Sequence, residues 1–121
     1  MSAQDVAQAF VQHYYTTRDS NPAALASLYQ PGSNLTFEGN MVTGGDAIAA
    51  KFQQIGQVKH NMKGMDVQPG QSNNCLIIFV TGSVQIGGDN PLHFCHFFQL
   101  VSTGPGAYYV HNEIFRLNYG L

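Results

Sequence analysis

The side chains of this chain that could transfer protons are acids and tyrosines. An acid removed from water can work with a tyrosine as general base and general acid, because burial moves the pKa of its carboxyl toward the working pH. The spacing selects no particular pair, so an isomerase or dehydratase acting on a small apolar substrate stays an open alternative. The candidates are Asp19, Glu38, Asp66, Asp89 and Glu113, with Tyr14, Tyr15, Tyr29, Tyr108 and Tyr109.

The histidines give no metal-binding pattern. His13, His60, His93, His96 and His111 are scattered, and no His-x-x-x-His or Cys-x-x-Cys spacing gathers them. Phosphate-loop and dinucleotide-binding motifs are also missing, so we predict no metal and no cofactor. His93 and His96 are an odd number of residues apart and should face opposite sides of a strand. One of them is therefore expected in the core or at the rim of a pocket.

Phe37 and Glu38 are the pair best suited to binding a partner. They lie in a short strand-like run over residues 34–39, next to Gly39, which can bend the backbone. A large ring beside an acid suits the lip of an apolar pocket. In an ordinary half-buried strand, however, Phe37 would pack inward and Glu38 would be solvated. The elements around the pair must decide between these interpretations.

Helices are predicted first along the chain. Ser2 and Asp5 match a capping box that precedes apolar residues at helical spacing, which predicts an amphipathic helix over 3–17. A short second helix is expected over 22–28, with Asn21 as its cap.

A ribbon and a third helix follow. Gly39-Asn40 offers turn residues that would pair the run containing Phe37 with a strand over 41–43. The third helix is predicted over 46–54, with Gly56 as its stop.

The rest of the chain has the alternation of long strands joined by turn-rich segments, which suits antiparallel neighbours. Helices followed by a meander predict an α+β fold, in which a strongly curved antiparallel sheet wraps three helices like a cone around an apolar cavity. The strands are expected over 58–67, 75–86, 92–101 and 107–117.

Composition limits the possible functions. The 121 residues suit one domain, 1–121, with 44% hydrophobic and only 10% charged residues. A net charge of −2 without a basic stripe disfavours nucleic-acid binding. Cys75 and Cys95 lie in apolar runs, as is typical of reduced core residues and a reducing compartment. Neither a signal peptide nor a membrane span is found, so we expect a soluble, intracellular protein without membrane contact.

With these elements in order, the chain resembles the nuclear transport factor 2 family over essentially its whole length. Four pieces of sequence carry the resemblance, and they occur in the family's order. They are Phe10-Val11-Gln12-His13-Tyr14-Tyr15, Leu35-Thr36-Phe37-Glu38-Gly39, Gln68-Pro69, and Asn112-Glu113-Ile114-Phe115-Arg116-Leu117.

The resemblance implies a noncatalytic homodimer that carries the GDP-bound GTPase Ran through nuclear pores and touches Phe-rich nucleoporin repeats. Such a carrier would occur in the cytoplasm, the nucleus and the nuclear pore. In the family, a cavity receives an aromatic side chain of Ran, and acids at its mouth pair with basic residues. Glu38 would be the main acidic anchor. By position, the Ran-binding residues would be Phe37, Glu38, Ile55, Val58, His60, Asp89, His93 and Phe115.

The chain departs from the family pattern in three places. Phe37 stands where many relatives have Trp, which keeps an aromatic wall without an indole N–H. The loop over 87–90 holds a single acid, Asp89, which weakens this second anchor. Ala3 stands where some relatives have an aromatic that helps to bind Phe-rich repeats, and the dimer face with Tyr119 nearby is an alternative site for them. Interaction modules of larger messenger-RNA export or stress-granule carriers share the resemblance and are a further alternative.

Overall fold

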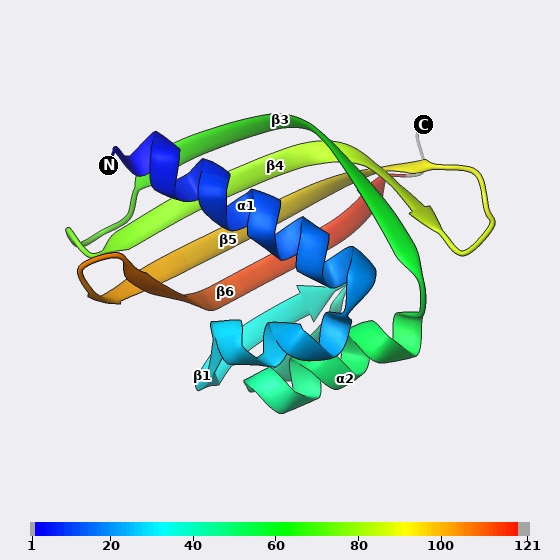
Figure 1. Ribbon diagram of the computed structural model, residues 1–121, viewed down its shortest axis with the longest axis horizontal. Coiled ribbons are helices and arrows are strands. Elements are labelled where there is room, and N and C mark those ends of the chain that lie inside the picture. Colours follow the sequence, from blue (N-terminus) through cyan, green and yellow to red (C-terminus); the bar gives the residue numbers. More distant parts are fainter. Residues whose placement is uncertain (1, 119–121) are drawn as a thin grey trace.

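The computed structural model describes residues 2–118, and its helices are those that the sequence predicts (Figure 1). α1 spans Ala3–Ser20, η1 is a 3₁₀ helix over Pro22–Leu28, and α2 spans Gly45–Ile55. The first helix runs about one turn past its predicted end, because residue 18 continues its buried face. Tyr119, expected near a dimer face, lies outside the described residues.

The ends of the first helix show one confirmed cap and one wrong prediction. The Ser2 hydroxyl oxygen accepts the N–H of Asp5 at 3.1 Å, and the Asp5 carboxylate accepts the N–H of Ser2 at 3.2 Å, which is the predicted capping box. The side chain of Asn21 makes no capping hydrogen bond to η1. Its backbone ends α1 instead, because its N–H donates to the Thr17 carbonyl at 2.7 Å.

The strands form a single sheet with the order β2-β1-β6-β5-β4-β3. The long strands begin where alternation and turn residues predict them. β4 matches its predicted bounds, and β3, β5 and β6 end two, three and one residues later than expected. The strands are β1 (Tyr29–Phe37), β2 (Asn40–Thr43), β3 (Val58–Pro69), β4 (Cys75–Ile86), β5 (Leu92–Gly104) and β6 (Ala107–Asn118).

One strand pair corrects the prediction of a purely antiparallel sheet. β1 lies parallel to β6, whereas the other neighbouring pairs are antiparallel. Because the chain leaves β1 through β2 and α2 and starts the meander at the far edge of the sheet, the last strand returns beside the first. This topology places Phe37 directly opposite Phe115.

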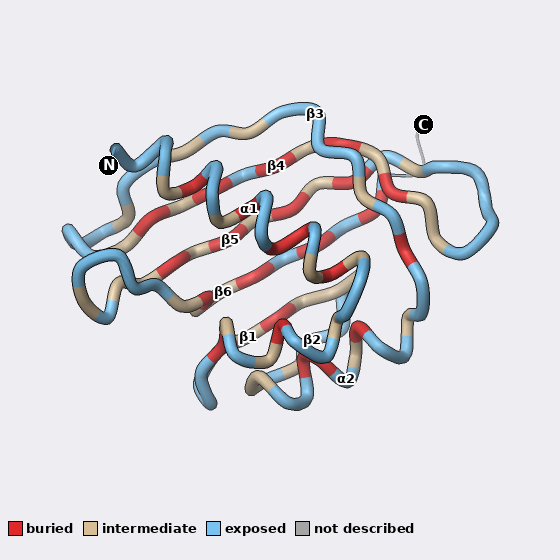
Figure 2. Tube along the Cα trace, in the orientation of Figure 1, coloured by how far each residue is buried: buried red, intermediate tan, exposed pale blue. Residues whose placement is uncertain are grey.

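The sheet curls around α1, which crosses its concave face, while η1 and α2 pack beside β1 (Figure 1). Buried and less buried positions alternate along the long strands (Figure 2), as in β4, where Leu76, Ile78 and Val80 face the helices. The buried apolar residues form one cluster that joins the helices to the sheet. The α+β class and the curved, cone-like architecture are thus confirmed.

Candidate functional site

Phe37 and Phe115 form the aromatic wall of a cavity between the sheet and the ends of α1 and α2. Their rings stack with centroids 5.0 Å apart and an interplanar angle of 2°. Phe115 stacks in turn on Phe94, at 5.3 Å and 21°. Phe94 and Phe115 are buried, whereas Phe37 is half-buried. The three rings therefore lead from the core to the protein surface.

The cavity unites five of the predicted residues, namely Phe37, Ile55, Val58, His60 and Phe115. Its volume is about 10 Å³, close to the space of one water molecule. Its rim is apolar, as expected. Its inner wall, however, carries buried polar side chains, so the prediction of an apolar cavity is only partly correct. The other lining residues are Tyr14, Arg18, Phe52, Ile86, His96 and Glu113.

Glu113 is the centre of that polar wall. It is 1% exposed, and its carboxylate accepts hydrogen bonds from the hydroxyls of Tyr14 and Tyr29, both at 2.5 Å. Burial raises the pKa of both tyrosine hydroxyls well above the ordinary value, and the charge of Glu113 raises it further. Both phenols are therefore neutral donors at physiological pH.

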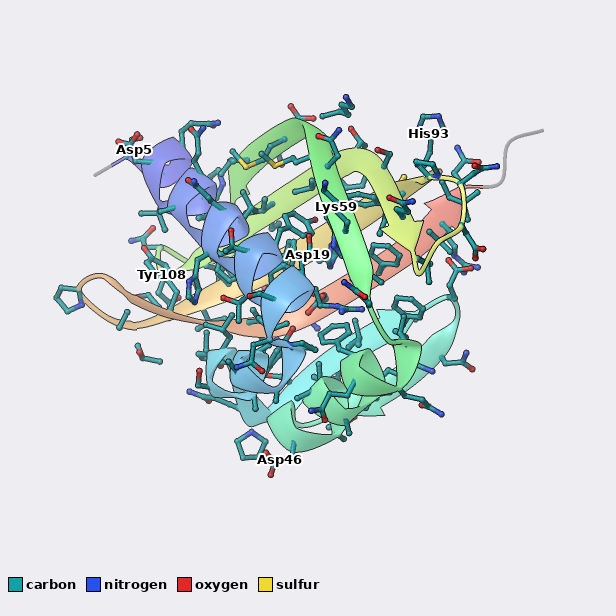
Figure 3. All side chains as sticks on the ribbon, turned by 45° about the vertical axis from the view of Figure 1, so that its right-hand side comes forward. Asp5, Asp19, Asp46, Lys59, His93 and Tyr108 are labelled. Carbon is teal, nitrogen blue, oxygen red and sulfur yellow. The ribbon has the colours of Figure 1, made fainter. Side chains whose placement is uncertain are left out.

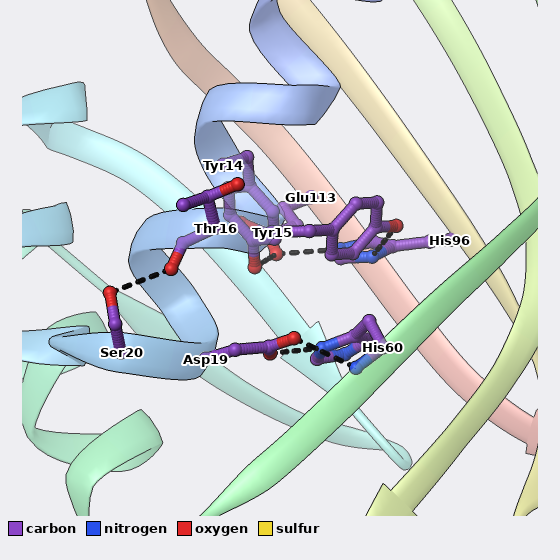
Figure 4. A network of polar contacts seen from close by, with 8 residues as sticks. All are labelled: Tyr14, Tyr15, Thr16, Asp19, Ser20, His60, His96 and Glu113. Atoms are coloured by element: carbon purple, nitrogen blue, oxygen red, sulfur yellow. Dashed lines mark hydrogen bonds and ion pairs between the residues drawn. The ribbon is translucent and has the colours of Figure 1, made fainter.

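His96 is the third group bonded to Glu113 (Figure 4). Its Nε2 lies 2.7 Å from a Glu113 oxygen, and its Nδ1 lies 2.8 Å from the Tyr15 hydroxyl. Burial lowers the pKa of His96, although the hydrogen bond to Glu113 opposes the effect. A neutral imidazole that donates through Nε2–H to Glu113 and accepts the Tyr15 O–H at Nδ1 gives both ring nitrogens a hydrogen-bond partner.

A second polar contact ties the end of α1 to the start of β3. Asp19 accepts the backbone N–H of His60 at 2.8 Å, and its other oxygen lies 2.7 Å from the His60 Nδ1 (Figure 4). The imidazole of His60 meets the Phe115 ring edge-to-face at 6.1 Å. Asp19 thereby fixes the predicted cavity residue His60 against the aromatic wall.

Arg18 brings a positive charge to the cavity lining. It is 4% exposed, and its guanidinium carbon lies 4.5 Å from the centroid of the Phe52 ring. Burial lowers the pKa of the guanidinium, and the neighbouring Tyr14, Asp19 and Glu113 act in the opposite direction. An arginine nevertheless stays charged in proteins. Its Nη1 is buried and makes no hydrogen bond to any residue of the described chain.

Glu38 lies in the turn beside the aromatic wall and is half-buried rather than fully solvated. The turn residues are Glu38 and Gly39, with φ of 51° and 86°, and not the predicted Gly39-Asn40. Positive φ at both positions is typical of the type I′ hairpin turn. The N–H of Glu38 donates to the Phe115 carbonyl at 3.0 Å, and its carboxylate accepts the N–H of Leu117. These bonds hold the acid against β6.

Asp89 and His93 are not among the residues that line the cavity. Asp89 is exposed in the turn between β4 and β5, and His93 is exposed near one edge of the molecule (Figure 3). The prediction that His93 supports the aromatic lining is wrong. The strand alternation turns His96 inward and His93 outward, so the inward histidine that the odd spacing required is His96.

The polar wall is the part of the site that sequence reasoning missed. Glu113 shares strand parity with Phe115 and Leu117, so an inward direction for one implies it for all three. Arg18 follows Ala7, Val11 and Tyr14 at helical spacing, and these four are among the buried residues of α1. Because the predicted helix ended at residue 17, Arg18 was not recognised as part of its buried face.

The outer face of the sheet carries exposed apolar side chains. Phe79, Phe97 and Ile114 lie directly opposite one another on β4, β5 and β6. Phe79 is 40% exposed and Ile114 is 49% exposed. A row of this kind is unusual on a surface that faces water, where most large apolar side chains are scattered singly.

A groove lies at the other end of α1, away from the cavity. It has a volume of about 580 Å³ and runs between α1 and the hairpin of β5 and β6, near Tyr108 (Figure 3). The lining residues are Val6, Ala9, Phe10, His13, Leu100, Gly106 and Tyr108.

The described residues offer neither a metal-binding cluster nor a membrane-spanning helix. Within residues 2–118, no group of three or more His, Cys, Asp or Glu side chains is arranged to hold a metal ion. None of the described helices is long and apolar enough to cross a bilayer.

The chain is similar to known proteins over nearly its whole length. A family model described as the Nuclear transport factor 2 (NTF2) domain matches residues 6–117. Nuclear transport factor 2 of Oryza sativa subsp. japonica is 48% identical over 123 residues, covering 99% of this chain and 100% of the relative. Nuclear transport factor 2B of Arabidopsis thaliana is 43% identical over 122 residues, covering 98% and 97%.

A solved structure of a nuclear transport factor 2 has the same fold as this chain. The structure of nuclear transport factor 2 from Cryptosporidium parvum superposes with a TM-score of 0.87 at 38% identity, covering 95% of this chain and 94% of that one. Relatives named as nuclear transport factors support a role in nuclear transport for this chain. On the extent of these matches, the chain belongs to the nuclear transport factor 2 family.

Proposed function

We propose that this chain is a noncatalytic carrier that binds Ran-GDP at the mouth of the cavity and brings it into the nucleus. The observation that carries the proposal is the stacked pair of Phe37 and Phe115 with Glu38 fixed beside it. A ring wall next to a half-buried carboxylate fits a partner segment with an aromatic side chain and a neighbouring basic residue. The resemblance to Ran carriers points to the same chemistry.

The expected energies suit a reversible shuttle. Burying one aromatic side chain contributes about 1.5–3 kcal/mol, and a charge-assisted bond from a basic residue to Glu38 sets its orientation. Because Glu38 is already held by the backbone of β6, little of its conformational freedom is lost on binding. An aromatic ring and an adjacent ion pair together form a typical binding hot spot.

Entry of a ring requires the rim to open. An apolar cavity that binds benzene has a volume of about 150 Å³, far larger than that of the closed cavity. The side chains that can move are the half-buried ones at the rim, Phe37, Ile55 and Ile86. Selectivity for the GDP form follows if Ran presents its aromatic segment only in that state.

The proposed carrier is a homodimer that uses the outer face of the sheet. The row of Phe79, Phe97 and Ile114 supplies the apolar centre that such an interface needs. A face of this kind pairs with a second copy of itself around a two-fold axis, which leaves the cavity of each copy accessible.

Contact with Phe-rich nucleoporin repeats is proposed at the groove between α1 and the hairpin of β5 and β6. Val6, Phe10 and Leu100 give it apolar walls, and its volume of about 580 Å³ accommodates a phenylalanine side chain with its neighbours. In this chain the groove would bind the Phe-rich repeats that some relatives bind with the help of an aromatic side chain at the position of Ala3. A carrier with these contacts moves between the cytoplasm, the nucleus and the nuclear pore.

The isomerase or dehydratase alternative has one observation in its favour. Glu113 is buried beside Tyr14 and Tyr29, which is the acid and tyrosine pairing that such an enzyme needs. However, both carboxylate oxygens of Glu113 already accept hydrogen bonds from Tyr14, Tyr29 and His96, so neither oxygen is presented to a substrate. The arrangement favours a structural role for Glu113 and a carrier function for the chain.

The test is a pull-down of Ran-GDP by variants at Glu38. Glu38→Lys should abolish binding while circular dichroism and sedimentation show a folded dimer. Glu38→Gln retains an oxygen for the Leu117 N–H and removes only the charge, so it separates ion pairing from turn stability. Normal binding of Ran-GDP by Glu38→Lys would show that the anchor is assigned wrongly.

A further inference from the structure

The Arg18 side chain separates two hollows of the molecule. One is the aromatic-walled cavity, whose volume is about 10 Å³. The other is an open pocket of about 270 Å³ at the ends of α1 and α2, called the outer pocket below, whose lining includes Asp19, Gln53 and Gln57. Among the described residues, Arg18 alone lines both hollows. The space inside the cavity therefore depends on where this side chain lies.

The observed position of the guanidinium satisfies it only in part. Its central carbon lies 4.5 Å from the centroid of the Phe52 ring, which lines the cavity, so a cation–π contact holds it on the cavity side. The side chain is 4% exposed, and its Nη1 has no hydrogen-bond acceptor among residues 2–118. Because the guanidinium stays protonated, the missing hydrogen bond weakens this position at every physiological pH.

The outer pocket offers the acceptors that the observed position lacks. Gln53 and Gln57 are exposed, and each side-chain amide carries an oxygen that can accept a hydrogen bond. α2 ends beside the pocket, and its last turn contains no basic residue. An arginine at such an end bonds the last carbonyls and opposes the negative end of the helix dipole. A guanidinium in the outer pocket would keep its charge and gain hydrogen bonds.

The other polar side chains of the cavity are held in place. Tyr14 and His96 are both hydrogen-bonded to Glu113, and His60 is bonded to Asp19. Neither of the ion pairs found among residues 2–118 includes Arg18. Arg18 is thus the polar side chain of the cavity lining that can move at the lowest cost.

We propose that Arg18 is the gate of the cavity: its guanidinium moves into the outer pocket when an aromatic side chain of a partner enters. Opening of the rim gives a ring access, but a space of about 10 Å³ must also grow. The guanidinium is flat and lies against Phe52, so the space that it leaves allows a phenyl ring to stack there. The inference rests on the proposed function, in that a partner's ring enters this cavity.

The test uses toluene, the side-chain analogue of phenylalanine, titrated into the full chain and followed by NMR. In the free protein, the Phe52 ring shifts the signals of the Arg18 side chain. With toluene bound, these signals should lose that ring-current shift, and nuclear Overhauser contacts should appear between the Arg18 Nε–H and the amide of Gln53 or Gln57. Binding of toluene with unchanged Arg18 signals, or no binding to the unaltered protein, would overturn the proposal.

A variant that fills the outer pocket tests whether the guanidinium needs it. Gln53→Trp occupies the pocket without adding a side chain to the cavity, so toluene should bind at least about tenfold more weakly. Gln54→Trp is the matched control, because Gln54 is exposed on α2 and belongs to neither lining, and it should bind toluene as the unaltered protein does. Equal affinities of the two tryptophan variants would contradict the movement of Arg18.

A double-mutant cycle shows whether the effect passes through Arg18. Arg18→Ala removes the gate, so adding Gln53→Trp to it should leave the affinity for toluene unchanged. An equal loss of affinity with and without the Arg18 side chain would show that the tryptophan acts on the cavity directly, and the proposal would fail. If Arg18→Ala does not fold, the Arg18 signals and the two single tryptophan variants decide the question.

A parallel titration with Ran-GDP keeps the two proposals separate. If toluene displaces Arg18 and Ran-GDP does not bind, the gate stands and the carrier function fails. If Ran-GDP binds and toluene leaves the Arg18 signals unchanged, the carrier function stands and the gate fails.

Discussion

The hydroxyl of Tyr29 donates a 2.5 Å hydrogen bond to the carboxylate of Glu113, and this bond joins the start of β1 to β6 across 84 residues of sequence. Tyr14 adds a bond from α1, and His96 adds one from β5. A single buried acid thus connects the first helix and three strands. Tyr14, His96 and Glu113 line the inner wall of the cavity, so the network fixes the surface against which the aromatic wall packs.

Removal of the Glu113 carboxylate should destabilise the fold strongly. Glu113→Ala leaves three buried donors without their acceptor, and each unsatisfied buried group costs about 1–3 kcal/mol. We expect the free energy of unfolding to fall by at least about 3 kcal/mol in urea denaturation. Asp66→Ala is the matched control, because Asp66 is exposed on β3, and its effect should stay within about 0.5 kcal/mol. Similar values for the two variants would contradict the role of Glu113.

Stability should decrease at mildly acidic pH because of His96. Burial lowers the pKa of His96 in the folded protein, whereas the unfolded chain has the ordinary value of about 6.5. Below about pH 6.5 the unfolded state therefore binds a proton that the folded state does not, and the free energy of unfolding falls as the pH falls. The stabilising contribution of the neutral His96 is fully present above about pH 6.5 and is lost as the pH falls below it.

Urea denaturation between about pH 5 and 7.5 measures this dependence. His96→Gln should give a flatter profile than the unaltered protein. His13→Gln should keep the original slope, because His13 is exposed on α1. An unchanged slope in His96→Gln would show that other groups cause the loss of stability.

A charge on the outer face of the sheet should separate the proposed dimer. Ile114 is 49% exposed and lies between Thr36 and Phe97 in the register of the sheet. Ile114→Glu places a carboxylate, and its symmetry mate, in the apolar centre of the interface, so sedimentation should show monomers at micromolar concentration. Gln12→Glu adds the same charge on the exposed side of α1 and should leave the dimer intact. Persistence of the dimer in Ile114→Glu would place the interface elsewhere.

Local patterns allowed most of the fold to be predicted. The alternation of β4 and the capping box at Ser2 and Asp5 depend on neighbours in sequence, and both are found as expected. The parallel pairing of β1 with β6 depends on where distant strands meet, and no local pattern carries that information. The turn at Glu38 was displaced by one residue because a non-glycine residue adopts positive φ there.

The site was predictable where it is apolar and hidden where it is polar. Phe37 and Phe115 could be placed from the family resemblance, and the structure brings their rings together. The partners of Glu113 come from three other elements, so their meeting is a property of the tertiary fold. Arg18 carried a helical-spacing signal, but a buried arginine whose Nη1 has no acceptor among residues 2–118 is unexpected from sequence because charged residues usually face water.

The most direct test of the carrier function is a calorimetric titration of the purified protein with Ran-GDP and, in parallel, with Ran-GTP. Ran-GDP should bind saturably to the unaltered protein and not to Glu38→Lys, and Ran-GTP should not bind at the same concentrations. Binding of neither form, or equal binding of both, would contradict the proposed carrier function.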